Sequence, residues 1–128
     1  MIYLDSNVFI YAATDSGPQG KAAAKVLTKA LRDGACTASL TADEVLWAVT
    51  KKLGREVAAE KVRQLLELDL TIAPVDKKDI EAALVQFDAG LDPRDAIHAA
   101  VALRAGCTAI ASSDPAFAKV KGLRHDAY

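Results

Sequence analysis

The chain has 128 residues, 52% hydrophobic and 26% charged, and this composition predicts a single globular domain over residues 1–128. No apolar run approaches the roughly 18 residues of a membrane-spanning helix, and no secretion signal is visible at the N-terminus, so we expect a cytoplasmic protein without a membrane segment. The formal net charge of −1 excludes a general electrostatic attraction to nucleic acid. Any polyanion must therefore bind through local patches or metal ions.

The predicted elements alternate between short apolar segments and longer segments with apolar residues at helical spacing. Several of the helical segments end in glycine, which favours a helix stop. In chain order, the pattern predicts a strand at 2–4, a helix at 6–13, a turn at 15–20, a helix at 21–34, a strand at 35–39, helices at 41–54 and 55–69, a strand at 70–75, helices at 76–90 and 92–106, a strand at 107–112, a helical turn at 114–120 and an edge strand at 123–128.

This alternation indicates an α/β fold. The strands are apolar on both faces, which is typical of a parallel sheet covered by helices on each side. We therefore expect a three-layer α/β/α sandwich with a short, mostly parallel sheet. Ligands of such sheets bind beyond the carboxyl ends of the strands, so the junctions between strands and helices are the places to search for a site.

Carboxylates stand at these junctions. Asp5 follows the first strand, Glu44 lies near the start of the helix after the second, Asp95 lies near the start of the helix at 92–106, and Asp114 follows the fourth strand. In this topology the four side chains can converge on one edge of the sheet. Carboxylates that lie close together repel one another and need a cation to stay ionised, and a hard divalent ion such as Mg²⁺ prefers oxygen ligands.

Each acid also has a purely structural interpretation, because acidic residues commonly cap the first turn of a helix. Thr41 and Glu44 fit a capping box, and Asp92 before Pro93 fits an N-cap followed by proline at the first helical position. The remaining candidate caps are Asp5, Asp114 and, where no chemistry is assigned, Asp76 with Asp79.

Four segments in this order, LDSNVFIY, TADEVLWAV, DPRDAIHAA and SSDPAF, resemble the motifs of PIN domains, and more closely those of the VapC-type toxin ribonucleases of VapBC toxin–antitoxin pairs. The resemblance implies a PIN-like fold and a metal-dependent endoribonuclease. In it, Asp5, Glu44, Asp95 and Asp114 would be the catalytic residues and would bind one or two Mg²⁺ or Mn²⁺ ions. Ala116 departs from the pattern, because many relatives carry another acid there.

The resemblance also implies partners: an RNA substrate, a second copy of the chain in a homodimer, and a small antitoxin whose tail crosses the acidic groove. Two alternatives stay open, namely a PIN-fold ribonuclease of RNA maturation and a catalytically weak binding module. Retention of all four acids favours an enzyme, because Ser, Thr or Asn would serve equally well as caps.

Other residues are predicted to support the site or the core. His98 lies one helical turn from Asp95 on the same face, and we expect it to pack or support rather than to act as a general base. Tyr11 and Trp47 are interpreted as core residues, although not every apolar side chain of these two helices can point inward. Cys36 and Cys107 are expected to be buried free thiols. The remaining supporting residues are Ser6, Asn7, Asp92 and Ser112, and the best basic stretch, taken as a solvated surface with an RNA track as the alternative, is Lys51, Lys52, Arg55, Lys61 and Arg63.

Overall fold

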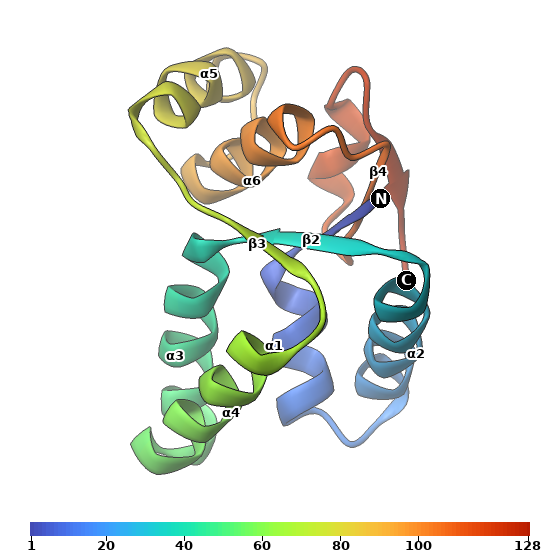
Figure 1. Ribbon diagram of the computed structural model, residues 1–128, viewed down its shortest axis with the longest axis vertical. Helices are drawn as coiled ribbons and strands as arrows, with labels where there is room; N and C mark the ends of the chain where they lie inside the picture. The colour runs from blue at the N-terminus through green and yellow to red at the C-terminus, as the bar shows by residue number, and fades with distance from the viewer.

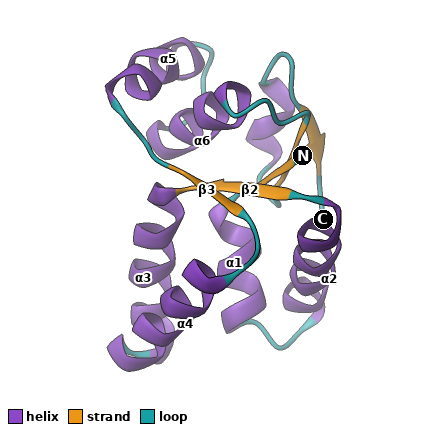
Figure 2. Cartoon of the chain, viewed as in Figure 1, coloured by secondary structure: helices purple, strands orange, loops and turns teal.

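The computed structural model describes residues 1–128 and contains one five-stranded sheet in the order β3-β2-β1-β4-β5. Every pairing between neighbouring strands is parallel, which confirms the predicted sheet. The strands are short compared with the helices (Figure 2), and the strand order places β1 in the middle of the sheet. They are β1 (Ile2–Leu4), β2 (Ala35–Ala38), β3 (Thr71–Ala73), β4 (Ala109–Ala111) and β5 (Arg124–Asp126).

Helices cover both faces of the sheet. Figure 1 shows α1 to α4 on one side, and α5 and α6 on the other. None of the helices combines the length and apolarity needed to cross a membrane. Their bounds are α1 (Ser6–Thr14), α2 (Pro18–Asp33), α3 (Ser39–Leu53), α4 (Arg55–Glu67), α5 (Lys77–Asp88) and α6 (Pro93–Arg104), and a short 3₁₀ helix, η1 (Pro115–Lys119), follows β4. The predicted three-layer α/β/α sandwich is therefore confirmed.

The two faces of the sheet belong to two separate hydrophobic cores. Successive strand residues point to opposite faces, so Tyr3 enters the core under α6 and Leu4 enters the core shared with α1, α3 and α4. The buried face of α6 consists largely of alanines, whose small size lets the helix lie close to the sheet. Cys36 and Cys107 are free and buried in the core under α6, as predicted.

Most predicted boundaries differ from the observed ones by one or two residues, and two predicted helix starts are wrong for a local reason. Residues 18–20 belong to α2 rather than to a turn, because Pro18 takes the favoured first position of the helix. Helix α3 begins at Ser39, so Thr41 lies inside the helix and its hydroxyl pairs with that of Thr37 at 2.7 Å. The predicted capping box of Thr41 with Glu44 is therefore wrong, which leaves Glu44 free for another role.

The capping box predicted for Asp76 and Asp79 is confirmed, and it is extended by an ion pair. The two side chains accept reciprocal hydrogen bonds from each other's backbone amides, at 3.1 and 3.0 Å. Arg104, at the end of α6, donates from Nε and Nη2 to the two carboxylate oxygens of Asp79, at 2.5 and 3.1 Å. The hydrogen bond from Arg104 holds the pKa of Asp79 below its ordinary value. This contact fixes α5 against α6.

We predict that Asp79→Ala lowers the free energy of unfolding by about 2 kcal/mol at neutral pH. This loss of stability is smaller than that expected for breaking a fully buried ion pair, because Asp79 is 1% exposed but the side chain of Arg104 is 43% exposed. Since the pKa of Asp79 is lower in the folded state, its contribution is complete above the unfolded pKa of about 3.9 and is lost as the pH falls through the folded value.

Chemical denaturation of the wild type and Asp79→Ala between pH 3 and 7 measures this difference. The difference in free energy of unfolding between the two proteins should become smaller towards pH 3. Asp69→Ala changes an exposed acid and is the matched control, with little effect at any pH. An equal difference in free energy of unfolding at pH 3 and pH 7 would show that the charge of Asp79 does not contribute to stability.

Candidate active site

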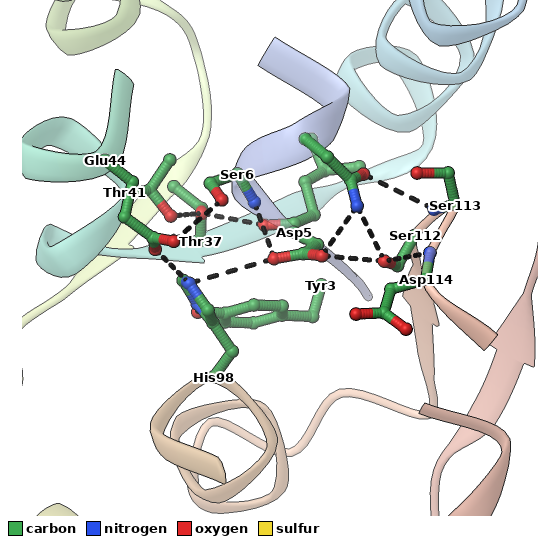
Figure 3. A network of polar contacts seen from close by, with 12 residues as sticks. Tyr3, Asp5, Ser6, Thr37, Thr41, Glu44, His98, Ser112, Ser113 and Asp114 are labelled. Atoms are coloured by element: carbon green, nitrogen blue, oxygen red, sulfur yellow. Dashed lines mark hydrogen bonds and ion pairs between the residues drawn. The ribbon is translucent and has the colours of Figure 1, made fainter. Parts of the chain in front are cut away.

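Asp5 lies directly after β1, where the chain turns into α1, and is only 4% exposed. One oxygen, Oδ1, accepts from the backbone amide of Ser6 at 2.8 Å, so Asp5 is a helix cap. The other, Oδ2, accepts from the hydroxyl of Ser112 at 2.7 Å and from the amide of Asn7 at 2.9 Å. Burial raises the pKa of Asp5 above its ordinary value, although His98 and the hydrogen bond from Ser112 oppose the shift. Asp5 thus caps helix α1 and at the same time belongs to a cluster of polar side chains (Figure 3).

Asn7 and Ser112 join the ends of β1 and β4. The amide nitrogen of Asn7 also donates to Ser112 Oγ at 3.0 Å, and its Oδ1 accepts from the hydroxyl of Tyr128 at 2.5 Å and from the Ser113 amide at 3.4 Å. Ser112 Oγ in turn accepts from the backbone amide of Asp114 at 3.0 Å. Both side chains are therefore saturated with hydrogen bonds, and they fix the direction of the Asp5 carboxylate.

Glu44 reaches the same edge from α3, and its side chain is 15% exposed. Its Oε2 accepts from Ser6 Oγ at 3.2 Å, and its Oε1 forms a close hydrogen bond with Nε2 of His98. The same Nε2 lies 3.8 Å from Asp5 Oδ1. An imidazole therefore stands between the two carboxylates.

The charge of His98 bears on the predicted crowding of acids. Burial lowers the pKa of His98, but the hydrogen bond to Glu44 and the negative charges of Asp5 and Glu44 outweigh burial, so the pKa lies above its ordinary value. The sequence alone indicated no positively charged side chain near these acids. The structure corrects this interpretation for Asp5 and Glu44, because a protonated His98 can balance part of their negative charge.

Asp95 and Asp114 also lie near Asp5. Asp95 is in the first turn of α6 and half-buried. Burial and the charges of Asp5 and Asp114 raise its pKa to about 7. Asp114 caps η1, because its Oδ1 accepts from the amide of Ala116 at 2.9 Å. The charges of Asp5 and Asp114 thus oppose the ionisation of Asp95, which is the electrostatic condition that a bound cation relieves.

These oxygens fit a hard divalent cation better than a soft one. No three His, Cys, Asp or Glu side chains lie close enough to form a complete protein ligand set for one ion. Mg²⁺ commonly takes only one or two carboxylates and completes its shell with water and phosphate oxygens. One or two carboxylates from among Asp5, Asp95 and Asp114 would match that preference, whereas a zinc site would require a closed set with nitrogen or sulfur ligands.

Other predicted residues lie outside this cluster. Asp92 holds the N-cap position of α6, but it is exposed and its side chain caps no amide. Trp47 is 60% exposed, so its interpretation as a core residue is wrong. Tyr11 is half-buried. In the basic stretch, Lys61 is half-buried and the other residues are exposed, as predicted: Lys51, Lys52, Arg55 and Arg63.

Two tyrosines of the network were not predicted. Tyr3 forms a hydrogen bond of 2.6 Å between its hydroxyl and Nδ1 of His98. Its position two residues before Asp5 in a strand was a usable signal, because both side chains then point to the same face of the sheet. Tyr128 contacts Asn7, which is 121 positions away in the sequence, and no local sequence pattern predicts such a contact.

The sequence and the fold have known counterparts. The family model of the PIN domain matches residues 2–123. Ribonuclease VapC7 of Mycobacterium tuberculosis is 31% identical over 131 residues, which cover 98% of this chain and 90% of the relative.

Solved structures show the same fold. VapC20 of Mycobacterium tuberculosis, described as a sarcin-ricin loop cleaving toxin, has a TM-score of 0.79 at 14% identity and covers 97% of this chain and 99% of its own. VapBC2 of Rickettsia felis, bound to a promoter DNA fragment, has a TM-score of 0.74 at 18% identity, covering 99% and 98%. FitAcB of Neisseria gonorrhoeae has a TM-score of 0.76 at 16% identity, covering 98% and 97%. The match along residues 2–123, together with the 31% identity over nearly the whole chain, shows that this protein belongs to the PIN-domain family.

Proposed function

We propose that this protein is a metal-dependent endoribonuclease of the VapC type, the toxin of a toxin–antitoxin pair, which hydrolyses RNA phosphodiester bonds. The observation that carries the proposal is the crowding of Asp5, Asp95 and Asp114 at the carboxyl edge of the sheet, where burial and the neighbouring charges raise the pKa of Asp95 to about 7. The similarity to a relative named as a ribonuclease supports RNA as the substrate.

In this proposal the side chains of Asp5, Asp95 and Asp114 hold Mg²⁺ or Mn²⁺, and Glu44 contributes from the α3 side. The ion supplies Lewis-acid activation of water and stabilisation of charge on the phosphate. Ser112 and Asn7 hold the Asp5 carboxylate in one orientation through the hydrogen bonds at 2.7 and 2.9 Å. A chain with a net charge of −1 can bind a scissile phosphate at such an edge because a bound ion inverts the local charge.

We predict that Mg²⁺ or Mn²⁺ stabilises the folded protein. Binding to the folded state alone stabilises it by mass action, by about 2.7 kcal/mol at a hundredfold excess over Kd. Thermal melts with increasing metal should therefore show a rising Tm for the wild type, and a much smaller rise for Asp5→Asn. An unchanged Tm at millimolar metal in both proteins would contradict the site.

We predict that Asp5→Asn and Asp95→Asn each reduce RNA cleavage by about 1,000-fold or more, the order expected when several kcal/mol of charge stabilisation is lost. The fold should persist, because asparagine nearly preserves the shape of aspartate and caps a helix equally well. Initial rates on RNA and thermal melts measure the two effects separately.

The matched control is Asp43→Asn, which changes an exposed acid beside Glu44 and should leave the rate unchanged. If the acids serve only as caps, the two site variants should behave like this control. Normal cleavage by folded Asp5→Asn and Asp95→Asn would remove the catalytic assignment.

Exposed apolar side chains offer surfaces for the proposed second copy and antitoxin. They form a patch on α5, and Leu46 and Trp47 add a second exposed pair on α3; large apolar patches of this kind usually mark interfaces. A structural neighbour from Klebsiella pneumoniae is described as a toxin–antitoxin complex, which supports a protein partner for this chain. The α5 patch consists of Ile80, Leu84 and Phe87, which share one face of the helix and line one shallow pocket.

Co-expression with the product of a small neighbouring gene tests the toxin assignment. We expect a purified complex that cleaves RNA at least about tenfold more slowly than the free protein, because a basic side chain of the partner would pair with the carboxylates in place of metal. Equal rates for the complex and the free protein would favour the alternative, a ribonuclease of RNA maturation.

A further inference from the structure

A buried histidine and tyrosine lie directly beneath the candidate site, and the mechanism above uses neither. Tyr3 and His98 are fully buried, and their rings meet edge to face with centroids 5.7 Å apart. The tyrosine hydroxyl lies 2.6 Å from Nδ1 of His98, and Nε2 on the opposite side of the imidazole meets Glu44 Oε1. A continuous chain of hydrogen bonds therefore runs from β1 through α6 to α3 (Figure 3).

The direction of this chain follows from what each group can donate. An ionised carboxylate only accepts hydrogen bonds, so Nε2 must carry the proton shared with Glu44. The hydroxyl of Tyr3 then holds the ring from Nδ1, on the other side of the imidazole. Which nitrogen of a histidine is protonated is set by the partner of the other nitrogen.

Glu44 is directed by this contact and by one more. With Oε1 bonded to His98 and Oε2 accepting from Ser6 Oγ at 3.2 Å, both oxygens of Glu44 are engaged. The same Nε2 lies 3.8 Å from Asp5 Oδ1, so the imidazole also sets the spacing between Glu44 and Asp5. Rotation or loss of the ring would therefore displace a carboxylate of the site as well as open a cavity.

We infer that His98 and Tyr3 are positioning residues for Glu44: His98 holds the glutamate beside Asp5, and Tyr3 holds His98. The inference rests on the proposed function, since it gives Glu44 its place in the nuclease site. A residue that served packing alone would be apolar here, on a helix face otherwise made of alanines and one valine, because a buried imidazole is costly unless both nitrogens have partners.

Two variants of one residue separate positioning from packing. In His98→Gln the side-chain amide reaches the place of Nε2 and can still donate to Glu44. In His98→Asn it reaches only the place of Nδ1, so the bond to Glu44 is lost while a polar group still faces Tyr3. Loss of a hydrogen-bond partner to a metal ligand typically costs about 10–100-fold in activity or metal affinity.

We therefore expect His98→Asn to lower kcat by about 10–100-fold with little change in the KM for RNA, and His98→Gln to remain within about threefold of the wild type. Tyr3→Phe, which removes only the hydroxyl, should have a kcat between those of His98→Asn and His98→Gln. Tyr11→Phe is its control, since Tyr11 is a half-buried tyrosine outside this network. Equal losses in the Gln and Asn variants, in proportion to their lowered Tm, would overturn the inference in favour of packing.

A second readout does not depend on RNA cleavage. The chain has only two histidines, so nitrogen-15 spectra of the imidazoles can be assigned with a His125→Gln variant. We expect a protonated Nε2 in His98, and Glu44→Gln should shift the His98 signals and leave those of His125 unchanged. Calorimetric titration with Mn²⁺ should show weaker binding in His98→Asn than in His98→Gln.

A bare Nε2 in the spectrum of the wild type, or His98 signals that do not respond to Glu44→Gln, would overturn the inference. If the wild-type protein cleaves no RNA, the proposed function fails. The spectra and the metal titration then still decide whether His98 positions Glu44.

Discussion

Asp5 is a carboxylate held at 4% exposure at the end of the central strand of the sheet, and its burial opposes its own ionisation. The surrounding residues respond in two ways. On one side, hydrogen-bond donors from Ser6, Asn7 and Ser112 stabilise the charge. On the other sides, Glu44 approaches in direct contact with the imidazole of His98, whereas burial and the charges of Asp5 and Asp114 raise the pKa of Asp95 to about 7, although His98 opposes the shift. The proposed cation would relieve this repulsion at Asp95.

The fold keeps this unfavourable arrangement in place because β1 is fixed from both faces. Tyr3 and Leu4 are fully buried in different cores, and β1 pairs with β2 on one side and β4 on the other. The backbone amide of Asp5 continues the ladder by donating to the carbonyl of Ala111 at 3.1 Å. The free energy from burying these apolar side chains therefore holds the carboxylate at the edge, in the way that active sites are generally maintained at a local cost in stability.

The sequence predicted the strands, the helices and the four acids because their signals are local. Apolar runs, Pro18 and Pro93 at helix starts, and glycines such as Gly34 and Gly54 with positive φ at helix ends all act within a few residues. The convergence of the acids then followed from the rule for parallel sheets.

The contacts within the site could not be predicted in this way. Tyr3 and His98 meet across 95 positions, and Tyr128 and Asn7 across 121. Trp47 also eluded prediction, because helical spacing indicates which residues share a face but not whether another element covers that face.

Ala116 shows how the charge of the site is balanced at its remaining corner. Its backbone amide donates to Asp114 Oδ1 at 2.9 Å, so the position contributes a donor and no oxygen ligand. An acid at this position would add a ligand, and the affinity for a divalent ion generally rises with the number of charged ligands. It would also add a negative charge close to Asp114, whose own charge already helps to raise the pKa of Asp95. Alanine therefore lowers the repulsion within the ion-free protein and reduces the attraction for the ion, so that binding at this edge depends on the orientation of the carboxylates that remain.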